Sequence, residues 1–148
     1  MIRAAVAGLG WWGKHIVRRM KDSDALRVVT AIEANDAQAG FAAEHGIAFT
    51  TDFAAVLLDP AIDAVILCTP HTMHTGQVLA VAAAGKHVFC EKPLALTRAD
   101  AERSVQACRR APAAAPRPSP ARSAARGRSP ASRRPCGRPR RSARRRRG

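Results

Sequence analysis

The chain has 148 residues, of which 47% are apolar, so it is long enough and apolar enough to form one domain with a buried core. Its formal net charge of +14 suggests a nucleic-acid or membrane partner. The charge is uneven, however, because residues 1–108 carry 10 Lys and Arg against 11 Asp and Glu, whereas residues 109–148 carry 15 Arg and no acid. The basic excess therefore belongs to the last part of the chain, and the part that can fold is close to neutral.

The expected elements alternate between apolar strands and amphipathic helices along the first 110 residues. In chain order they are a strand at 2–7, a helix at 13–21, strands at 26–32 and 47–49 on either side of a helix at 36–45, a short helix after Asp52, a strand at 64–68, a helix at 75–84, a strand at 87–90 and a last helix after Thr97. Gly46 and Gly85 stop two of the helices. Asp52 is a predicted cap, and Thr97 with Asp100 is a predicted polar cap followed by an acid.

Continuous apolar strands that alternate with helices of about ten residues are typical of a parallel sheet covered on both faces. Right-handed crossovers leave few topologies for such a chain. We therefore predict an α/β fold, a Rossmann-type doubly wound parallel sheet of about five strands, at residues 1–110.

The last part of the chain has a different composition. Residues 109–148 use only six residue types and contain no Leu, Ile, Val, Phe or Met, so residues 111–148 are predicted to be a disordered tail rich in Arg, Ala, Pro and Ser. All six types have codons rich in G and C, and we favour a frameshifted reading frame as their origin. The alternative is a natural tail that binds nucleic acid non-specifically through its charge.

The cysteines and the apolar runs indicate the compartment. Cys68, Cys90, Cys108 and Cys136 form no CxxC pair and show no spacing typical of a metal site. Free cysteines in apolar runs fit a reducing environment. The first residues reach glycine too early for a signal peptide, and no apolar run approaches the roughly 18 residues of a membrane span. We therefore expect a cytoplasmic protein with no bound metal and no membrane partner.

A glycine-rich segment carries the first functional signal. Gly8-Leu9-Gly10-Trp11-Trp12-Gly13 fits the G-x-G-x-x-G pattern, follows a predicted strand and opens a predicted helix. Gly8 would allow a tight turn, Gly10 would let the backbone approach a pyrophosphate, and Gly13 would let helix and strand pack closely. Free N–H groups at the helix start would bind the anion. The candidate cofactor-binding residues here are Gly8, Gly10, Trp11, Trp12 and Gly13; the alternative is an ordinary strand–turn–helix.

Glu33 closes the second predicted strand, 25 residues after Gly8. Its carboxylate can accept hydrogen bonds from the adenosine ribose hydroxyls, and it would repel the 2′-phosphate of NADP. Ala34 and Asn35 follow it, so no Arg stands there to hold such a phosphate. The pattern therefore favours NAD over NADP, and the alternative for Glu33 is a solvated charge at a strand end.

Two further segments follow predicted strands, at the carboxyl ends where open α/β sheets bind their ligands. Thr69-Pro70 with His74 predicts a loop beside the nicotinamide. His71 and His74 are only a weak metal signal, because no third ligand accompanies them. In Glu91-Lys92-Pro93, Lys92 can hydrogen-bond or exchange a proton with a substrate hydroxyl, and a solvated turn is the alternative.

These segments together resemble the glucose–fructose oxidoreductase and inositol dehydrogenase family, often called Gfo/Idh/MocA. The resemblance covers residues 1 to about 110 and rests on residues 7–13, on Thr69-Pro70 with His74, and on residues 84–88 followed by 90–94. It implies NAD(P)-dependent hydride transfer at a hydroxyl-bearing carbon of a sugar, polyol or related compound. It also implies that Lys92 is the catalytic residue, that Glu91 lies near the cofactor, and that the peptide before Pro93 is cis.

The chain departs from the family in two ways. His71 stands where the family's Thr-Pro loop continues with Asn. The family's sixth strand and its second, α+β domain, which supplies an Asp and a His to the acid–base site, have no counterpart after Arg110. We therefore expect an oxidoreductase by family that is catalytically incompetent as this chain, because nothing holds a substrate at the nicotinamide.

Two other classes stay open at this point. A Rossmann enzyme that binds a nucleotide sugar or a methyl donor would use the same glycine segment and Glu33, but it has no need of Glu91-Lys92-Pro93. A nucleic-acid-binding protein that acts through the Arg-rich tail would bind in a salt-sensitive, sequence-independent way, because the tail has no aromatic residue.

Overall fold

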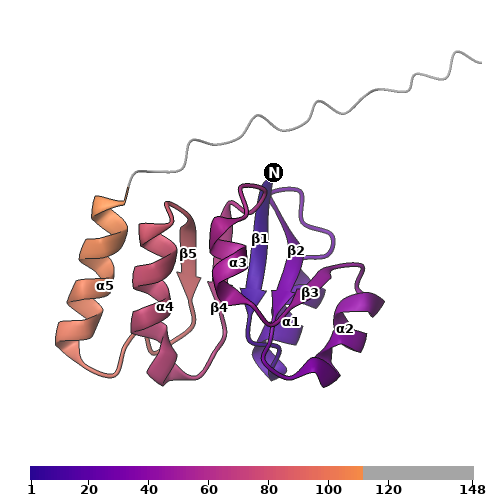
Figure 1. Cartoon of the computed structure of the whole chain (residues 1–148), viewed down its shortest axis with the longest axis horizontal. Helices are drawn as coiled ribbons and strands as arrows, with labels where there is room; N and C mark the ends of the chain where they lie inside the picture. The colour runs from indigo at the N-terminus through magenta and orange to yellow at the C-terminus, as the bar shows by residue number, and fades with distance from the viewer. Residues whose placement is uncertain (112–148) are drawn as a thin grey trace, which may run out of the picture.

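Five parallel strands form one sheet in the computed structural model, which describes residues 1–111 (Figure 1). The order is β3-β2-β1-β4-β5, so β1 is central and the direction of winding reverses between β1 and β4. The strands are β1 (Ile2–Ala7), β2 (Leu26–Ile32), β3 (Ala48–Thr50), β4 (Ala64–Leu67) and β5 (His87–Cys90). The predicted doubly wound α/β sheet is confirmed, and the predicted tail lies outside the described residues.

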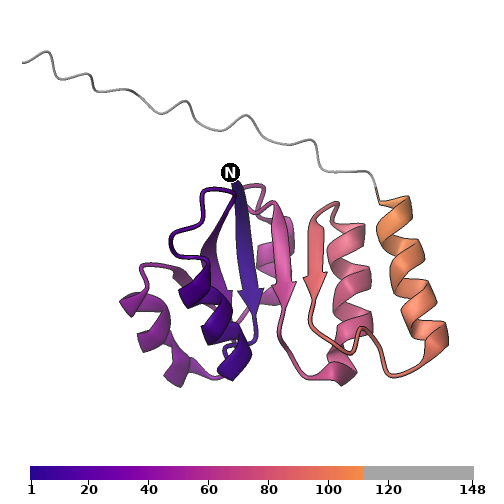
Figure 2. The ribbon, with the colours of Figure 1, turned by 180° about the vertical axis from the view of Figure 1, so that it is seen from behind.

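Helices cover both faces of the sheet (Figures 1 and 2). Helices α1 and α2 pack on one face and α3 and α4 on the other, while α5 packs against α4. The helical elements are α1 (Trp11–Arg19), the 3-10 turn η1 (Asp36–Gln38), α2 (Ala39–Glu44), α3 (Phe53–Leu58), α4 (His71–Ala83) and α5 (Arg98–Arg110).

Strand β1 contributes to both apolar layers. Ala4 and Val6 belong to the cluster shared with α1 and α2, whereas Ala5 and Ala7 belong to the cluster shared with α3 and α4. Successive residues of a strand face opposite sides of a sheet, so a strand covered on both faces must be apolar throughout. This explains why the buried strands read as continuous apolar runs in the sequence.

Three helices differ from their predicted bounds. Helix α1 begins at Trp11, directly after its N-cap residue Gly10 and before the predicted start at Gly13. Helix α4 begins at His71, after Pro70, whereas the sequence predicted a start at Thr75. The helix predicted at residues 36–45 is a 3-10 turn followed by the short α2. The two differences at α1 and α4 matter for the site, because both helices begin beside it.

The two predicted polar caps are confirmed. The Asp52 carboxylate accepts a hydrogen bond from the Ala55 N–H at 3.0 Å, where α3 begins. The Thr97 hydroxyl oxygen accepts from the Asp100 N–H at 3.1 Å, and the hydroxyl donates to the Asp100 carboxylate at 2.8 Å. Each cap satisfies a backbone donor that a helix start leaves free.

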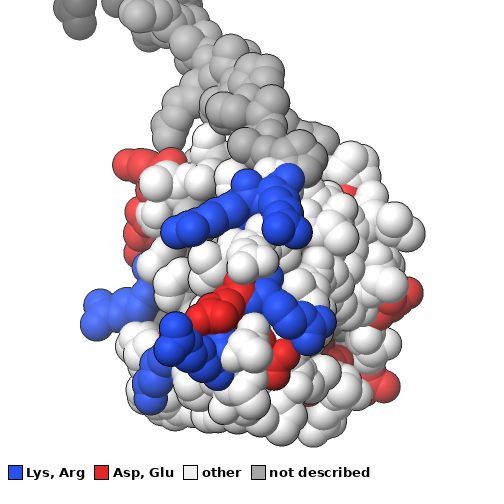
Figure 3. Space-filling view, turned by 90° about the vertical axis from the view of Figure 1, so that its left-hand side faces the viewer, with Lys and Arg blue, Asp and Glu red and all other residues white. Residues whose placement is uncertain are grey.

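Helix α5 carries a surface of mixed charge. Arg98 pairs with Glu102 at 2.8 Å and Arg103 with Asp100 at 3.1 Å, and Figure 3 shows basic and acidic side chains interspersed on this side of the molecule. Exposed pairs of this kind contribute little to stability. Within residues 1–111, none of the helices combines the length and the apolar character that crossing a bilayer requires.

Candidate functional site

The loop between β1 and α1 requires glycine at two positions. Gly8 has a φ of +92°, and a Cβ there would lie 2.6 Å from the Cys68 carbonyl oxygen. A Cβ at Gly13 would lie 1.9 Å from the Gly8 carbonyl oxygen. The first glycine therefore permits the turn against β4, and the second permits the close approach of α1 to the end of β1.

Gly10 differs from both, because nothing in the protein lies within 4 Å of a Cβ built there. It is the N-cap residue of α1, no side chain caps this helix, and its first turn holds no acidic residue. The start of a helix presents unpaired N–H groups and a positive dipole end, which together bind anions. Open space over a bare backbone at such a start fits a diphosphate group.

The Glu33 carboxylate lies against this loop. One of its oxygens accepts a hydrogen bond from the Leu9 N–H at 2.8 Å, and the other accepts from the Asn35 N–H at 3.2 Å. The Gly8 N–H donates to the Ile32 carbonyl at 2.8 Å, which ties the loop to the end of β2. The acid at the carboxyl end of β2 is therefore held beside the glycine loop, as the spacing in the sequence requires.

A cavity of about 390 Å³ lies where the start of α1 meets the ends of β4 and β5. Its lining residues are Trp11, Trp12, Cys68, Thr69, His71, Glu91 and Lys92. The structure thus brings together five predicted site residues from three separate segments. Cys68 and His71 were not among the predicted site residues, although Cys68 is the last residue of a predicted strand and so lies at the carboxyl end where a ligand was expected.

Two tryptophans form an aromatic side of this cavity. Trp11 is 75% exposed and Trp12 is 41% exposed, which is unusual for the largest apolar side chain. Their ring centroids lie 5.2 Å apart with 25° between the planes, and the His15 ring stacks on both. Exposed flat aromatic faces beside a cavity can pack against a planar ring or the apolar face of a sugar ring.

The loops after β4 and β5 form the opposite side. The Thr69 hydroxyl donates a hydrogen bond to the Gln77 side-chain oxygen, and Pro70 is the N-cap residue of α4. The Lys92-Pro93 peptide is cis, as the resemblance implied. His74 lies behind these loops instead of lining the cavity: it is fully buried, and its ring nitrogens contact backbone carbonyls.

The two partly buried thiols at this end of the sheet are poor nucleophiles. Burial raises the pKa of Cys68 to about 12, and the negative charge of Glu91 contributes in the same direction. Burial and then Glu91 also raise the pKa of Cys90. A thiol reacts through its thiolate, so neither cysteine is suited to covalent chemistry at neutral pH.

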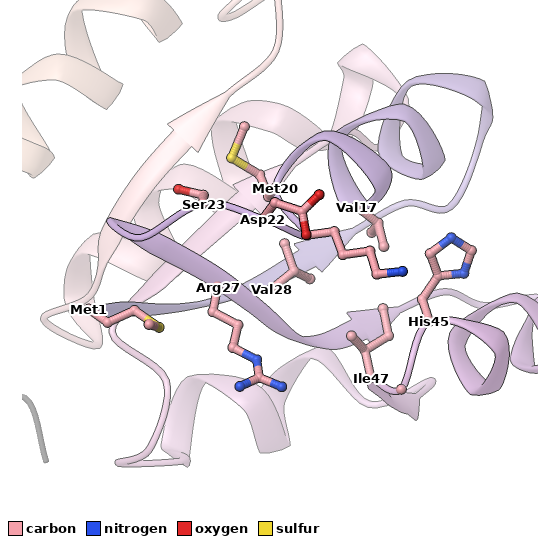
Figure 4. Close-up of a pocket in the computed structure, with 11 residues that line it drawn as sticks. Met1, Val17, Met20, Asp22, Ser23, Arg27, Val28, His45 and Ile47 are labelled. Carbon is pink, nitrogen blue, oxygen red and sulfur yellow. The ribbon is translucent and has the colours of Figure 1, made fainter. Parts of the chain in front are cut away.

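A second cavity, of about 340 Å³, lies at the opposite end of the strands (Figure 4). Met1, Arg27 and Val28 line it at the amino ends of β1 and β2, together with residues of α1 and of the turn before β3. Open α/β sheets bind ligands at the carboxyl ends of their strands. The first cavity is therefore the better candidate site. Among residues 1–111, no three metal-ligating side chains come together.

The glycine loop, the carboxylate at the end of β2 and the cavity beside β4 and β5 define a dinucleotide-binding domain of the Rossmann class. Residues 2–115 match the family described as "Oxidoreductase family, NAD-binding Rossmann fold", and the chain belongs to this family, Gfo/Idh/MocA.

Two curated relatives illustrate the similarity. The chain is 42% identical over 103 residues to 4-carboxy-2-hydroxymuconate-6-semialdehyde dehydrogenase of Sphingobium, a match that covers 68% of this chain and 33% of that protein. It is 37% identical over 108 residues to inositol 2-dehydrogenase 1 of Saccharopolyspora erythraea, which covers 70% of this chain and 32% of the relative. The chain therefore spans about a third of the length of these relatives.

Solved structures show the same domain. The WlbA dehydrogenase from Bordetella pertussis, in complex with NADH and UDP-GlcNAcA, is 31% identical with a TM-score of 0.69, over 74% of this chain and 32% of that one. Biliverdin reductase from Synechocystis, in complex with biliverdin and NADP+, is 29% identical with a TM-score of 0.69, over 73% and 34%. Structural neighbours thus include both NAD and NADP complexes.

Proposed function

We propose that this domain holds a nicotinamide dinucleotide for hydride transfer at a hydroxyl-bearing carbon of a sugar, polyol or related compound. The observation that carries the proposal is the open space at Gly10, over a helix start that no side chain caps. The segment from Gly8 to Gly13 would hold the diphosphate, and the two tryptophans and Lys92, which line the cavity, would border the nicotinamide.

Lys92 is the candidate catalytic residue. It lines the cavity together with Glu91 and Thr69, at the carboxyl ends of β5 and β4. When bound, the nicotinamide accepts or donates the hydride; Lys92 hydrogen-bonds the substrate hydroxyl and exchanges its proton. Inositol 2-dehydrogenase 1 and the WlbA complex with UDP-GlcNAcA support a hydroxylated substrate class.

The cofactor in this proposal is NAD in preference to NADP. The Glu33 carboxylate is fixed by the N–H groups of Leu9 and Asn35 at 2.8 and 3.2 Å, which hold it beside the glycine loop. This position supports a contact with the adenosine ribose. Ribose hydroxyls donate hydrogen bonds to a carboxylate, whereas a 2′-phosphate is repelled by it.

We further propose that these 148 residues bind the cofactor without turnover. Trp11 is 75% exposed and leaves one side of the cavity open to solvent in the described structure. Rapid hydride transfer requires a substrate held within reacting distance of the nicotinamide. Steady oxidation of polyols or sugars by this polypeptide, followed by NADH absorbance, would contradict the proposal.

Intrinsic fluorescence provides the test of binding. Trp11 and Trp12 are the only tryptophans in the chain, which has no tyrosine, so its fluorescence arises beside the proposed site. We expect NADH to quench this emission saturably and NAD to compete, while S-adenosylmethionine has no effect. Gly10→Ala should weaken the binding, and Arg27→Ala, in the second cavity, is the matched control that should leave it unchanged. Absence of NADH binding by calorimetry would refute the proposal.

A further inference from the structure

His74 differs from the other buried polar side chain in where its partners lie. His74 and Ser104 are the buried polar residues within the part of the chain that the structure describes. The Ser104 hydroxyl donates to the Asp100 carbonyl at 2.8 Å inside its own helix, α5. The ring of His74 instead contacts the carbonyls of Thr69 and Pro93, which belong to the loops after β4 and β5.

The chemistry of the ring limits how both contacts can form. Nδ1 lies 2.8 Å from the Pro93 carbonyl oxygen, and Nε2 lies 2.9 Å from the Thr69 carbonyl oxygen. A carbonyl oxygen only accepts, a neutral imidazole has one N–H, and an imidazolium has two. A neutral ring therefore donates to one of these carbonyls, and its other nitrogen lies against the second.

The two carbonyls belong to the loops that border the candidate cavity. The pairing of β4 with β5 ends at Leu67 and Cys90, where the Glu91 N–H donates to the Leu67 carbonyl at 3.0 Å. The strand pairing stops at this point. The ring of His74 then contacts both of the loops that follow, at Thr69 after β4 and at Pro93 after β5. Thr69 lines the cavity, and Pro93 directly follows Lys92, which also lines it.

We propose that His74 is a positioning residue for Lys92: its ring contacts tie the loop after β4 to the loop after β5, and so they fix Lys92 at the cavity. The role assigned to Lys92 rests on the proposed function, but the tie itself does not. His74 is not among the residues that line the cavity, so its effect on the reaction would pass through Lys92.

The first test measures the ring on the cofactor-free full chain. With 15N-labelled histidine, and with the His74 signals assigned by their loss in His74→Gln, we expect a ring N–H that exchanges slowly with water, because the ring is buried against the two loop carbonyls. A ring N–H that exchanges rapidly with water would overturn the proposal. Because no nicotinamide is present, a failure of NADH binding would refute the proposed function and leave this result standing.

The second test follows Lys92 itself. After reductive 13C-methylation, with the signal assigned by Lys92→Arg, we expect His74→Phe to shift the Lys92 resonance. His74→Gln should restore it in part, because its amide offers two N–H donors. Ser104→Ala, the matched loss of a buried hydrogen bond, should lower the melting temperature and leave the Lys92 signal in place. An unmoved Lys92 signal in a folded His74→Phe variant would overturn the proposal, and so would a His74→Gln signal no closer to that of the unsubstituted chain than the signal of His74→Phe.

Discussion

Gly10 and Gly13 lie in one loop, yet a methyl group would meet different surroundings at each. At Gly13 it would lie 1.9 Å from the Gly8 carbonyl oxygen, and at Gly10 it would meet nothing within 4 Å. We expect Gly13→Ala to reduce the free energy of unfolding by about 3 kcal/mol or more, because backbone must move. Gly10→Ala should change it by less than about 1 kcal/mol while lowering the affinity for NADH. Urea unfolding measures the stability of each variant, and the fluorescence titration measures its affinity for NADH. Equal losses of stability in the two variants would contradict the assignment of Gly13 to packing and of Gly10 to binding.

Glu33 gives a prediction about cofactor choice. Its carboxylate is fixed between the N–H groups of Leu9 and Asn35, so it cannot turn away from a 2′-phosphate without losing both bonds. We expect NADH to bind more tightly than NADPH, and Glu33→Gln to narrow the ratio about tenfold by removing a repulsion of about 1.4 kcal/mol. Parallel titrations with both reduced cofactors measure the ratio. A ratio that stays the same in Glu33→Gln would show that this charge does not select the cofactor.

Part of the site could be predicted at the residue scale. The reasons for glycine at Gly8 and Gly13 follow from the motif, and the structure shows the positive φ and the close approach that they describe. The hydrogen bond from Leu9 to Glu33 and the two carbonyl contacts of His74 could not be predicted. They join segments far apart in the sequence, and no local pattern encodes which backbone atom a side chain meets.

At the scale of single elements, the start of α5 depends on Thr97. Its hydroxyl accepts from the Asp100 N–H and donates to the Asp100 carboxylate. We expect Thr97→Ala to lower the free energy of unfolding by about 1 kcal/mol, because a backbone donor loses its partner. Thr97→Ser keeps the hydroxyl and should retain most of the stability. Thermal unfolding of the two variants tests this, and equal melting temperatures would argue against the cap.

The ends of β4 and β5 predict how stability depends on pH. The Cys68 thiol has a pKa of about 12 in the folded chain, against an ordinary value of 9.0. Below pH 9.0 the thiol is protonated in both the folded and the unfolded chain, so its contribution to the free energy of unfolding is fully present. As the pH rises from 9.0 towards 12, the unfolded chain releases this proton first, and the free energy of unfolding falls. Cys68→Ala should make the free energy of unfolding, measured by urea titration, fall less steeply between pH 9.0 and 12. The same pH dependence in Cys68→Ala as in the unsubstituted chain would contradict this prediction.

Element types were more predictable than element ends. The strands β1, β2 and β5 have their predicted bounds, because each strand-like run stops at a glycine or at a glutamate. Helix α4 begins four residues earlier than predicted, since the polar residues after Pro70 read as a loop although the helix already includes them. The first turn of this helix carries His71, which lines the cavity, and His74, which contacts the loops after β4 and β5. Tertiary contacts therefore decide this boundary.

On the scale of the whole molecule, parallel pairing brings the candidate site residues to one end of the sheet. All four strand pairings are parallel, so β2, β4 and β5 deliver Glu33, Thr69 and Lys92 to the same end of the sheet. The second cavity occupies the opposite end (Figure 4). This polarity follows from the alternation of strands and helices and was predictable from the sequence, whereas the shape of the cavity was not.

The central position of β1 also sets the order in which the backbone opens. β1 is hydrogen-bonded on both sides, to β2 and β4, whereas β3 and β5 each pair on one side within the described sheet. We expect the amides of Ala4 to Ala7 to take up deuterium last and those of β3 among the first. Mass spectrometry of peptic fragments resolves these segments. Such an order of exchange would mean that local unfolding starts at the edge strands and that β1 is the last strand to lose its hydrogen bonds.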